Sequence, residues 1–377
     1  MTRKLYYEDC HLREFSARVV SCGKTEKGWE VVLDATAFYP EGGGQACDIG
    51  TLGGANVLDT RERGEEIIHL CDAPLEAGSI VSGAICWERR FDLMQQHTGE
   101  HIVSGVIARR WGYANVGFHM GADFVTIDFD GPIPPEALPE IEAEANRILW
   151  RNIPVKCWIP SPEELPGVAY RTKRALPWPV RIVEIPGGDS CACCGVHVAA
   201  TGEVGLIKLF SCVKFHQGVR IEMACGGRAM RLLNACYEQN RQVSQAFSAK
   251  IWETGEAARR MNDALAKEKF QRTALQKQVF ASVAESYVNQ ETALHIADNL
   301  TPGEVRELAE AIREKVTAVA GAYSQGSLCI IGDAERVKDL GARLKALGAR
   351  GGGKPGCWQG SVSIDEGQIR GLFRENS

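Results

Sequence analysis

The sequence predicts an α+β protein with an N-terminal β-barrel, an α+β core, a helical arm and a C-terminal α/β module. Three observations lead to this prediction. β-rich runs alternate with glycine-rich turns at the start of the chain, a long proline-free helical segment follows the middle of the chain, and a compact mixture of strand and helix patterns ends it. We place the four parts at 1–88, 89–230, 231–290 and 291–377.

The first two parts carry the predicted strands. Runs rich in β-branched and aromatic residues alternate with turns at 15–21, 29–34 and 80–87, which is typical of a small antiparallel barrel. Similar runs in the second part lie at 124–129, 181–185 and 204–209. Since helical segments separate these later runs, the second part is predicted to mix strands with helices.

A helix is predicted over 95–111, where apolar residues recur at helical spacing and no proline interrupts them. This segment, QQHTGEHIVSGVIARRW, contains His97 and His101. Side chains four residues apart lie on one face of a helix, one turn from each other. The two imidazoles are therefore placed to bind one cation, although two histidines at this spacing can also simply form a polar helix face.

A second short pair, Cys193 and His197, lies in the sequence SCACCGVHVAATGEVG. One thiolate with three imidazoles is a donor set that suits zinc rather than calcium or magnesium. Cys193 has the four-residue spacing to His197, but Cys191 and Cys194 compete with it for the thiolate role. Spacing alone also leaves open a purely structural zinc site.

The helical arm and the last part complete the organisation. The segment 229–290 has no proline and irregularly spaced apolar residues, so a packed helical arm is predicted rather than a long coiled coil. In the last part, a strand at 327–331 is expected between helices at 302–323 and 334–347. Backbone N–H groups near Gly352, together with Lys354, could hold a phosphate, or this glycine run is a mobile loop.

Composition is that of a globular intracellular protein. Hydrophobic residues make up 45% and charged residues 24% of the chain, which are ordinary values. The first ten residues lack the apolar run of a secretory signal, and no apolar run is long enough to cross a membrane. The 14 cysteines are scattered rather than framed for disulfides. We therefore expect a cytoplasmic protein that has no membrane partner.

The net charge of −5 argues against extensive nucleic-acid binding, because phosphate contacts require clustered basic residues. Local clusters are nevertheless present. Arg89 and Arg90 precede the predicted histidine helix, and Arg171 and Arg174 precede the cysteine motif. We expect Arg89 and Arg174 to contribute to a small basic surface that binds one end of an RNA, although each could also be an ordinary solvated residue.

Four motifs together resemble one family. The glycine-rich segment 31–52, QQHTGEH and CCGVHVAATGEVG resemble the editing domain of alanyl-tRNA synthetases, and ALGARGGGKPGCWQG is similar to the C-terminal domain of the same enzymes. Their order and spacing match over nearly the whole chain, as in long-form AlaX proteins, the free-standing alanyl-tRNA editing proteins. The sequence departs from the family at CCGVH, where CGGTH is usual, and at Cys357 and Trp358.

The resemblance implies a zinc ion bound by the residues His97, His101, Cys193 and His197. It also implies hydrolysis of tRNA(Ala) mischarged with serine or glycine, with Thr36 as the residue that senses serine. Because no aminoacylation domain precedes the glycine-rich segment, the expected action is in trans. For the C-terminal domain and the arm, the resemblance suggests contact with tRNA or formation of a homodimer.

The glycine-rich segment and the helix supply the expected catalytic and binding groups. Thr36 and Gln45 are polar groups that could recognise a serine hydroxyl, while the backbone of Gly42, Gly43 and Gly44 could approach the substrate closely. Thr36 could equally occupy its strand because of its β propensity. Glu100, between the two histidines, is a candidate general base.

Two other interpretations remain open. HTGEH also fits the HxxEH pattern of inverted zinc peptidases, in which Glu100 would be the base. That interpretation leaves the cysteine motif and the glycine-rich segment unexplained. The second alternative is a non-catalytic tRNA-binding module that zinc stabilises.

Overall fold

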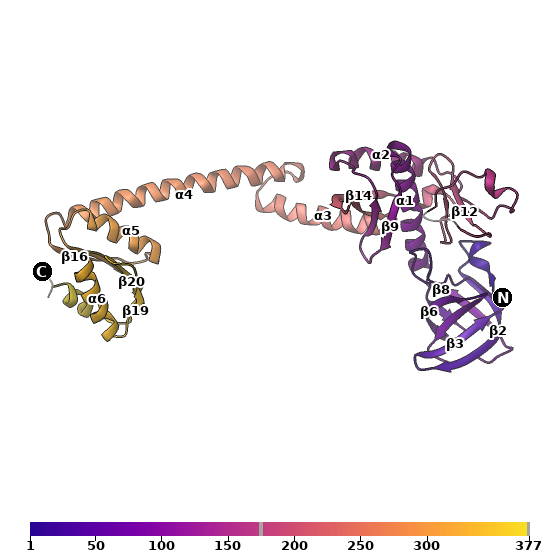
Figure 1. Cartoon of the computed structure of the whole chain (residues 1–377), viewed down its shortest axis with the longest axis horizontal. Coiled ribbons are helices and arrows are strands. Elements are labelled where there is room, and N and C mark those ends of the chain that lie inside the picture. Colours follow the sequence, from indigo (N-terminus) through magenta and orange to yellow (C-terminus); the bar gives the residue numbers. More distant parts are fainter. Residues whose placement is uncertain (173–175, 375–377) are drawn as a thin grey trace. The chain divides into compact units, whose positions relative to one another are not determined.

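The computed structural model describes residues 1–172 and 176–374. They divide into two compact units, Met1–Gln242 and Val243–Ser377. Figure 1 shows a barrel and a mixed α/β layer in the first unit and a sheet with helices in the second. The chain is thus of the α+β class, as predicted, whereas the four-part division at 88, 230 and 290 stays a prediction. None of the described helices is long and apolar enough to cross a membrane.

Six strands of the first unit close into a barrel in the order β2-β3-β7-β6-β5-β8 (Figure 1). Apolar side chains that alternate along these strands fill the interior. The strands are β2 (Glu14–Thr25), β3 (Gly28–Leu33), β5 (Gly50–Leu52), β6 (Ala55–Arg63), β7 (Glu66–Cys71) and β8 (Ile80–Ile85). Beside the barrel, the short strands β1 (Arg3–Lys4) and β4 (Ala35–Thr36) pair in parallel.

Helix α1 (Trp87–Trp111) follows the barrel directly and carries the histidine pair. It begins eight residues earlier than the apolar pattern predicted and ends at Gly112, which has the left-handed φ of 72° that favours glycine. With α2 (Leu138–Trp150), it encloses the main core of the unit against a four-stranded sheet. That sheet has the order β14 (Ile207–Phe215), β15 (Gly218–Cys225), β10 (Val125–Phe129) and β9 (Asn115–Met120).

A second, small antiparallel sheet also packs against α1, through its strand β13. It consists of β11 (Lys156–Trp158), β12 (Ile182–Ile185) and β13 (Asp189–Ala192). The approach of β13 to α1 is close because Gly105 faces it. A Cβ atom at Gly105 would lie 2.2 Å from the carbonyl oxygen of Gly188, so a larger residue there would push strand and helix apart.

The segment predicted as a helical arm consists of two helices. α3 (Gly226–Ala246) and α4 (Thr254–Glu285) are separated by a turn in which Ser248 has a positive φ of 49°. The division between the units falls inside α3. The sequence did not indicate this break because the break contains neither proline nor glycine, the residues that most often mark one.

The second unit is built on a five-stranded sheet. Its order is β16 (Thr292–Ile296), β17 (Val319–Ser324), β18 (Ser327–Gly332), β20 (Cys357–Ser361) and β19 (Arg350–Gly352). Helices α5 (Pro302–Arg313), α6 (Ala334–Ala346) and α7 (Glu366–Arg374) accompany it. The helix predicted over 302–323 was too long. Its last part is the inner strand β17, where small residues such as Gly321 fit beneath the ring of Phe373.

Candidate metal centre

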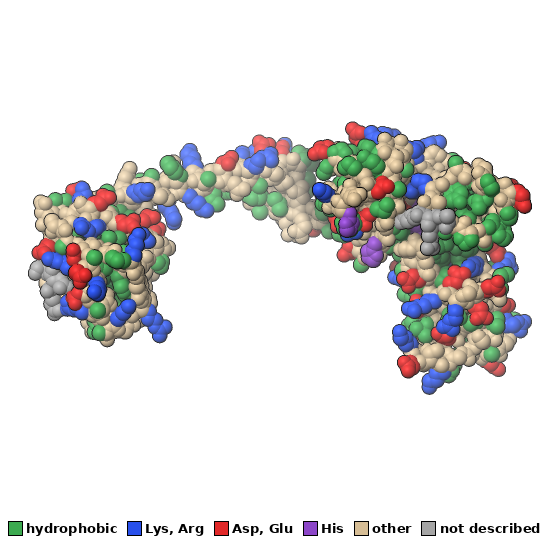
Figure 2. Space-filling view, in the orientation of Figure 1, with side chains coloured by type: hydrophobic (Ala, Val, Ile, Leu, Met, Phe, Trp, Pro, Cys, Tyr) green, Lys and Arg blue, Asp and Glu red, His purple; other side chains and the backbone are tan. Residues whose placement is uncertain are grey.

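The four side chains predicted to bind a metal come together in the first unit. Helix α1 contributes His97 and His101, and the segment after β13 contributes Cys193 and His197. All four donor atoms lie within 4.8 Å of one another, and the three imidazoles are buried. Figure 2 shows that few imidazoles reach the face drawn there.

Distances within the group suit a tetrahedral ion. The Sγ atom of Cys193 lies 3.3 Å from Nε2 of His97 and 3.5 Å from Nε2 of His197. Around a tetrahedral zinc with ordinary bond lengths, neighbouring nitrogen and sulfur donors are about 3.3–3.6 Å apart. The chemistry of the donors, their burial and their separation therefore all fit zinc.

Two of the imidazoles are oriented through hydrogen bonds at their Nδ1 atoms, which leaves Nε2 for a metal. Nδ1 of His97 lies 2.9 Å from Oε1 of Gln45, and Nδ1 of His197 lies 3.1 Å from Oγ1 of Thr98. Fixing one ring nitrogen in this way determines which nitrogen can bind the ion.

The electrostatics of the group favour a thiolate. Burial alone would raise the pKa of Cys193, but the surrounding imidazoles of His97, His101 and His197 hold it well below its usual value. Burial likewise opposes the charged form of His101, yet contacts with Asp189 and Cys193 raise its pKa well above the usual value. Burial and the neighbouring His97 lower the pKa of His197 to about 3. The Cys193 thiolate and the neutral imidazole of His197 are thus ready to bind a cation, whereas His101 would release its proton when it binds one.

The competing cysteines have different surroundings. Burial is the main cause that raises the pKa of Cys191, to about 11, and that of Cys194. The Cys194 thiol points toward the glycine-rich loop, since a Cβ atom on Gly43 would lie 2.9 Å from its Sγ atom. Only Cys193 has its sulfur within 3.5 Å of two of these imidazoles among the described residues, so the geometry favours Cys193 as the ligand.

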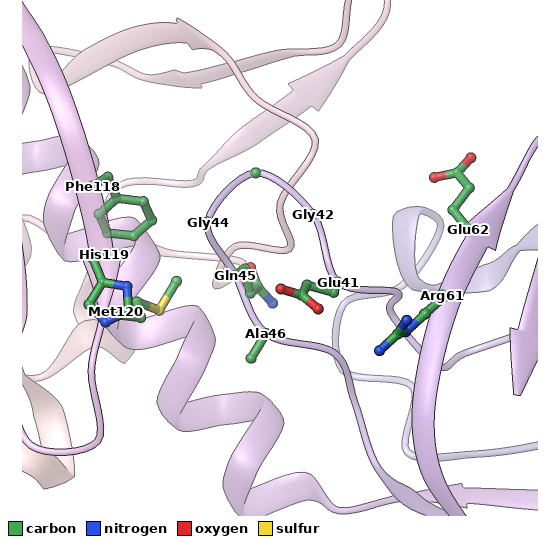
Figure 3. A pocket seen from close by; sticks show the side chains of 11 residues that line it. Glu41, Gly42, Gly44, Gln45, Ala46, Arg61, Glu62, Phe118, His119 and Met120 are labelled. Carbon is green, nitrogen blue, oxygen red and sulfur yellow. The ribbon is translucent and has the colours of Figure 1, made fainter. Parts of the chain in front are cut away.

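A pocket of about 790 Å³ lies at the glycine-rich loop. Figure 3 shows the loop from Glu41 to Ala46 facing Phe118, His119 and Met120 of β9. Gly44 has a positive φ of 82°, and a Cβ atom there would lie 2.6 Å from the ring of Phe118. That ring in turn packs on His97, with ring centroids 5.3 Å apart. Glycine at this position therefore allows the loop to lie against the candidate metal centre.

Gln45 connects the pocket to the metal ligands. Its Oε1 atom accepts a hydrogen bond from the backbone N–H of Val196 and lies beside Nδ1 of His97. Its Nε2 atom is buried and has no hydrogen-bond partner among the described residues, although Gln45 also lines the pocket. Because an unpaired buried donor is costly, this amide is positioned to donate to a bound molecule.

Comparison of the sequence with known proteins shows which families it resembles. Residues 180–222, which include the cysteine motif, match the family "Threonyl and Alanyl tRNA synthetase second additional domain". The chain is 27% identical to alanyl-tRNA editing protein Aarsd1 of Danio rerio, over 98% of the chain and 96% of that protein. It is 36% identical to alanyl-tRNA editing protein AlaX-L of Pyrococcus horikoshii, over 62% of the chain and 60% of that protein.

These matches support a free-standing, AlaX-type alanyl-tRNA editing protein. The chain is also similar to the alanine–tRNA ligase of Thermofilum pendens, with 33% identity over 98% of the chain but only 44% of the ligase. The chain therefore spans less than half of the ligase that it matches.

Thr36, which the family resemblance implies as the serine sensor, lies in a buried chain of hydrogen bonds. His69 of β7 places Nδ1 3.0 Å from the carbonyl oxygen of Val31 and Nε2 2.8 Å from Oγ1 of Thr36. Since a carbonyl only accepts, Nδ1–H donates to it and the Thr36 hydroxyl donates to Nε2. The Thr36 oxygen also accepts the N–H of Phe38. Thr36 does not line the pocket of Figure 3.

Glu100 is close to the metal ligands but is also tied down. Its Oε1 atom lies 2.5 Å from both Oγ of Ser104 and Nδ2 of Asn115. Its Oε2 atom lies 4.0 Å from Nε2 of His101. One oxygen therefore anchors the carboxylate while the other faces the candidate metal centre.

The predicted basic surface is only partly supported. Arg90 is fully buried against Asp48 and cannot contact RNA, so that expectation was wrong. Arg89 donates to the carbonyl oxygen of Cys47 from the first turn of α1. Arg174 lies outside the described residues. In the second unit, Gly352 ends β19 and Lys354 follows it, both exposed.

Sequence patterns missed the side chains that orient this site. Asp189 lies four residues before Cys193, and an acidic residue next to a ligand motif is a usable signal for a partner of a metal-bound histidine. Thr98 directly follows His97, so it could have been considered as a hydrogen-bond partner of a ligand. Nothing in the sequence pairs His69 with Thr36, because 33 residues separate them.

Because His69 is buried, we expect the free energy of unfolding to fall in acid. Burial is the main cause that lowers its pKa from 6.5 to about 4, so the unfolded chain binds an extra proton between these values. We expect this group to contribute about 3 kcal/mol of stability at pH 7, lost as the pH falls from about 6.5 to 4. Urea unfolding at several pH values would measure it. His69→Gln should show a smaller loss than the wild type over this window, and equal losses would contradict the prediction.

Proposed function

We propose that this protein is a trans-editing hydrolase that removes serine from mischarged Ser-tRNA(Ala), and glycine from Gly-tRNA(Ala), at a zinc centre. Two relatives that resemble it are named alanyl-tRNA editing proteins, and one of them is covered over 96% of its length. The observation that carries the proposal is the buried Cys193 group beside the glycine-rich pocket. Such a role agrees with the cytoplasmic location predicted from the sequence.

In the proposed reaction, His97, His101, Cys193 and His197 hold the zinc ion. When bound, zinc supplies Lewis-acid polarisation of the ester carbonyl or of a water molecule. The chain's own groups bind and orient the substrate. Gln45 donates from its unpaired Nε2 to the aminoacyl end, and the backbone of Gly43 and Gly44 lets the substrate approach closely.

Glu100 is proposed to accept the proton of the attacking water through Oε2. The contacts of its other oxygen to Ser104 and Asn115 keep the carboxylate turned in this direction. Because an aminoacyl ester is already an activated substrate, a positioned water with such an acceptor is a sufficient nucleophile. We also propose that Arg89, Arg174, Gly352 and Lys354 contact the tRNA.

Deacylation of Ser-, Gly- and Ala-tRNA(Ala), with and without chelation of zinc, tests the function. We expect rapid, zinc-dependent loss of serine and glycine while alanine is largely spared. The zinc content of each sample should be measured in parallel. A protein that holds one zinc per chain yet hydrolyses none of the three substrates would contradict the proposal.

We also propose that α4 forms a homodimer. Met261, Leu265, Leu275 and Val279 expose between 50% and 61% of their surface, and their spacing places them on one face of the helix. In Figure 2, hydrophobic and basic side chains cover α4. The four positions are symmetric about residue 270, so a second antiparallel α4 would pair Met261 with Val279 and Leu265 with Leu275.

Two charges on the same face follow the same symmetry. Glu268 and Arg272 lie between the apolar positions, and they form no ion pair with each other among the described residues. In an antiparallel pair centred on residue 270, each Glu268 would face Arg272 of the second copy. The face is therefore complementary to itself in both hydrophobicity and charge.

A charge exchange tests this dimer. Glu268→Arg alone, or Arg272→Glu alone, should place like charges opposite each other and weaken association by about ten-fold or more. The double exchange should restore it. Sedimentation velocity over a range of concentrations would measure the dissociation constants, with Phe270→Ser on the opposite face as the control. Equal association in all variants, or none in the wild type, would refute the proposed pairing.

A further inference from the structure

His101 differs from the other two imidazoles of the centre in the group that faces its Nδ1 atom, which has no hydrogen-bond partner among the described residues. The others face a neutral amide or hydroxyl oxygen. His101 faces a carboxylate, because its Nδ1 atom lies 3.2 Å from Oδ2 of Asp189. A carboxylate beside a metal-bound imidazole fixes which nitrogen carries the proton and strengthens the other nitrogen as a ligand.

The Asp189 carboxylate is itself immobilised. Its side chain is 2% exposed, and Arg171 grips it with two parallel bonds, from Nε to Oδ1 and from Nη2 to Oδ2, each 2.7 Å long. This bidentate geometry holds the plane of the carboxylate as well as its position. The Oδ2 atom is shared between the guanidinium and the imidazole.

Backbone pairing places Arg171 in register with this carboxylate. The N–H of Arg171 donates to the carbonyl oxygen of Ser190, and the N–H of Ala192 donates to the carbonyl oxygen of Arg171. On the other side, Gly105 lies one helical turn after His101 and allows close approach, because a Cβ atom there would lie 2.9 Å from Cβ of Asp189. Helix α1, strand β13 and the backbone at Arg171 thus fix the positions of the His101, Asp189 and Arg171 side chains.

We propose that Asp189, clamped by Arg171, is a positioning residue that sets the zinc affinity of the centre through His101. Arg171 precedes the cysteine motif in a basic stretch of the sequence, and its side chain bonds to Asp189. The inference rests on the proposed zinc centre but not on the identity of the substrate. It predicts that metal binding, and not only turnover, depends on a pair that supplies no ligand.

Zinc affinity, measured by competition with a chromophoric chelator, tests this role. Asp189→Asn keeps an oxygen near His101 but removes the charge, and it should lower zinc affinity by about 10- to 100-fold. Arg171→Lys keeps the charge but not the two-bond grip, so it should cause a smaller loss in the same direction. The absorption spectrum of the cobalt(II)-substituted protein should shift in both variants.

The pair Asp128 and Arg220 provides a matched control. It has the same two-bond geometry, with distances of 2.7 and 2.8 Å, and neither residue belongs to the candidate metal groups. Asp128→Asn should leave zinc affinity and the cobalt spectrum unchanged. Circular dichroism of the metal-free proteins would show whether each variant folds. If Asp189→Asn does not fold, the zinc affinity of Arg171→Lys tests the positioning role.

The outcomes separate this role from the proposed function. Folded variants at Asp189 and Arg171 with wild-type zinc affinity and cobalt spectra would overturn the positioning role alone. A wild-type protein that binds no zinc would overturn the metal centre and this inference with it. Zinc binding that depends on Asp189, in a protein that fails to deacylate any of the three tRNA substrates, would support this inference and refute the editing function.

Discussion

Replacing Cys193 with serine is expected to release the zinc ion and to slow deacylation of Ser-tRNA(Ala) by about 1,000-fold, equivalent to about 4 kcal/mol. The thiolate is the only negative donor among the four, and the imidazoles hold its pKa well below the usual value. A serine hydroxyl is a poor ligand for zinc. Its loss would leave three imidazoles without the charge that balances the ion.

The neighbouring cysteines give the control for this prediction. Cys191→Ser and Cys194→Ser should retain one zinc per chain and most of the activity. Cys193 has its sulfur within 3.5 Å of two imidazoles, whereas Cys191 is grouped with one imidazole only, that of His101, and Cys194 with none. Zinc content by atomic absorption and initial deacylation rates would be measured on all three variants. If Cys194→Ser, rather than Cys193→Ser, released the metal, the assigned ligand would be wrong.

Short-range patterns explain which parts of this centre could be predicted. The four-residue spacing of His97 and His101 determines their relation once the segment is a helix, because helix geometry is local. The same holds for the strand at 327–331, which contains only apolar and small residues and was predicted almost to its ends. Local patterns therefore predict both elements, and the histidine pair that α1 carries.

Long-range pairing explains most of what could not be predicted. Residues 319–324 are rich in small residues that fit a helix equally well, and only their position between β16 and β18 makes them a strand. Arg90 was placed on the surface because its burial depends on Asp48, 42 residues earlier. The clamp on His101 likewise joins residues from three separate segments.

Thr36→Val is expected to retain zinc and to reduce the preference for Ser-tRNA(Ala) over Ala-tRNA(Ala) by about 100-fold. The Thr36 hydroxyl donates to His69 and accepts the N–H of Phe38, so one lone pair remains on its oxygen. In this arrangement Thr36 can only accept a further hydrogen bond. The prediction requires a substrate serine to reach this oxygen, which is fully buried and does not line the pocket of Figure 3 in the structure described. Such a serine would supply the donor, whereas alanine would leave the acceptor unpaired.

Thr36→Ser is the matched variant, because it keeps the hydroxyl and should keep the preference. Valine also deprives His69 of its donor, so a loss of stability of about 1–3 kcal/mol is expected from Thr36→Val. Selectivity is therefore measured as the ratio of kcat/KM values for the two substrates, which unfolding of part of the sample does not change. An unchanged ratio in a folded, zinc-containing Thr36→Val protein would show that the hydroxyl serves the barrel alone. Recognition of serine would then have to rest on the unpaired amide of Gln45.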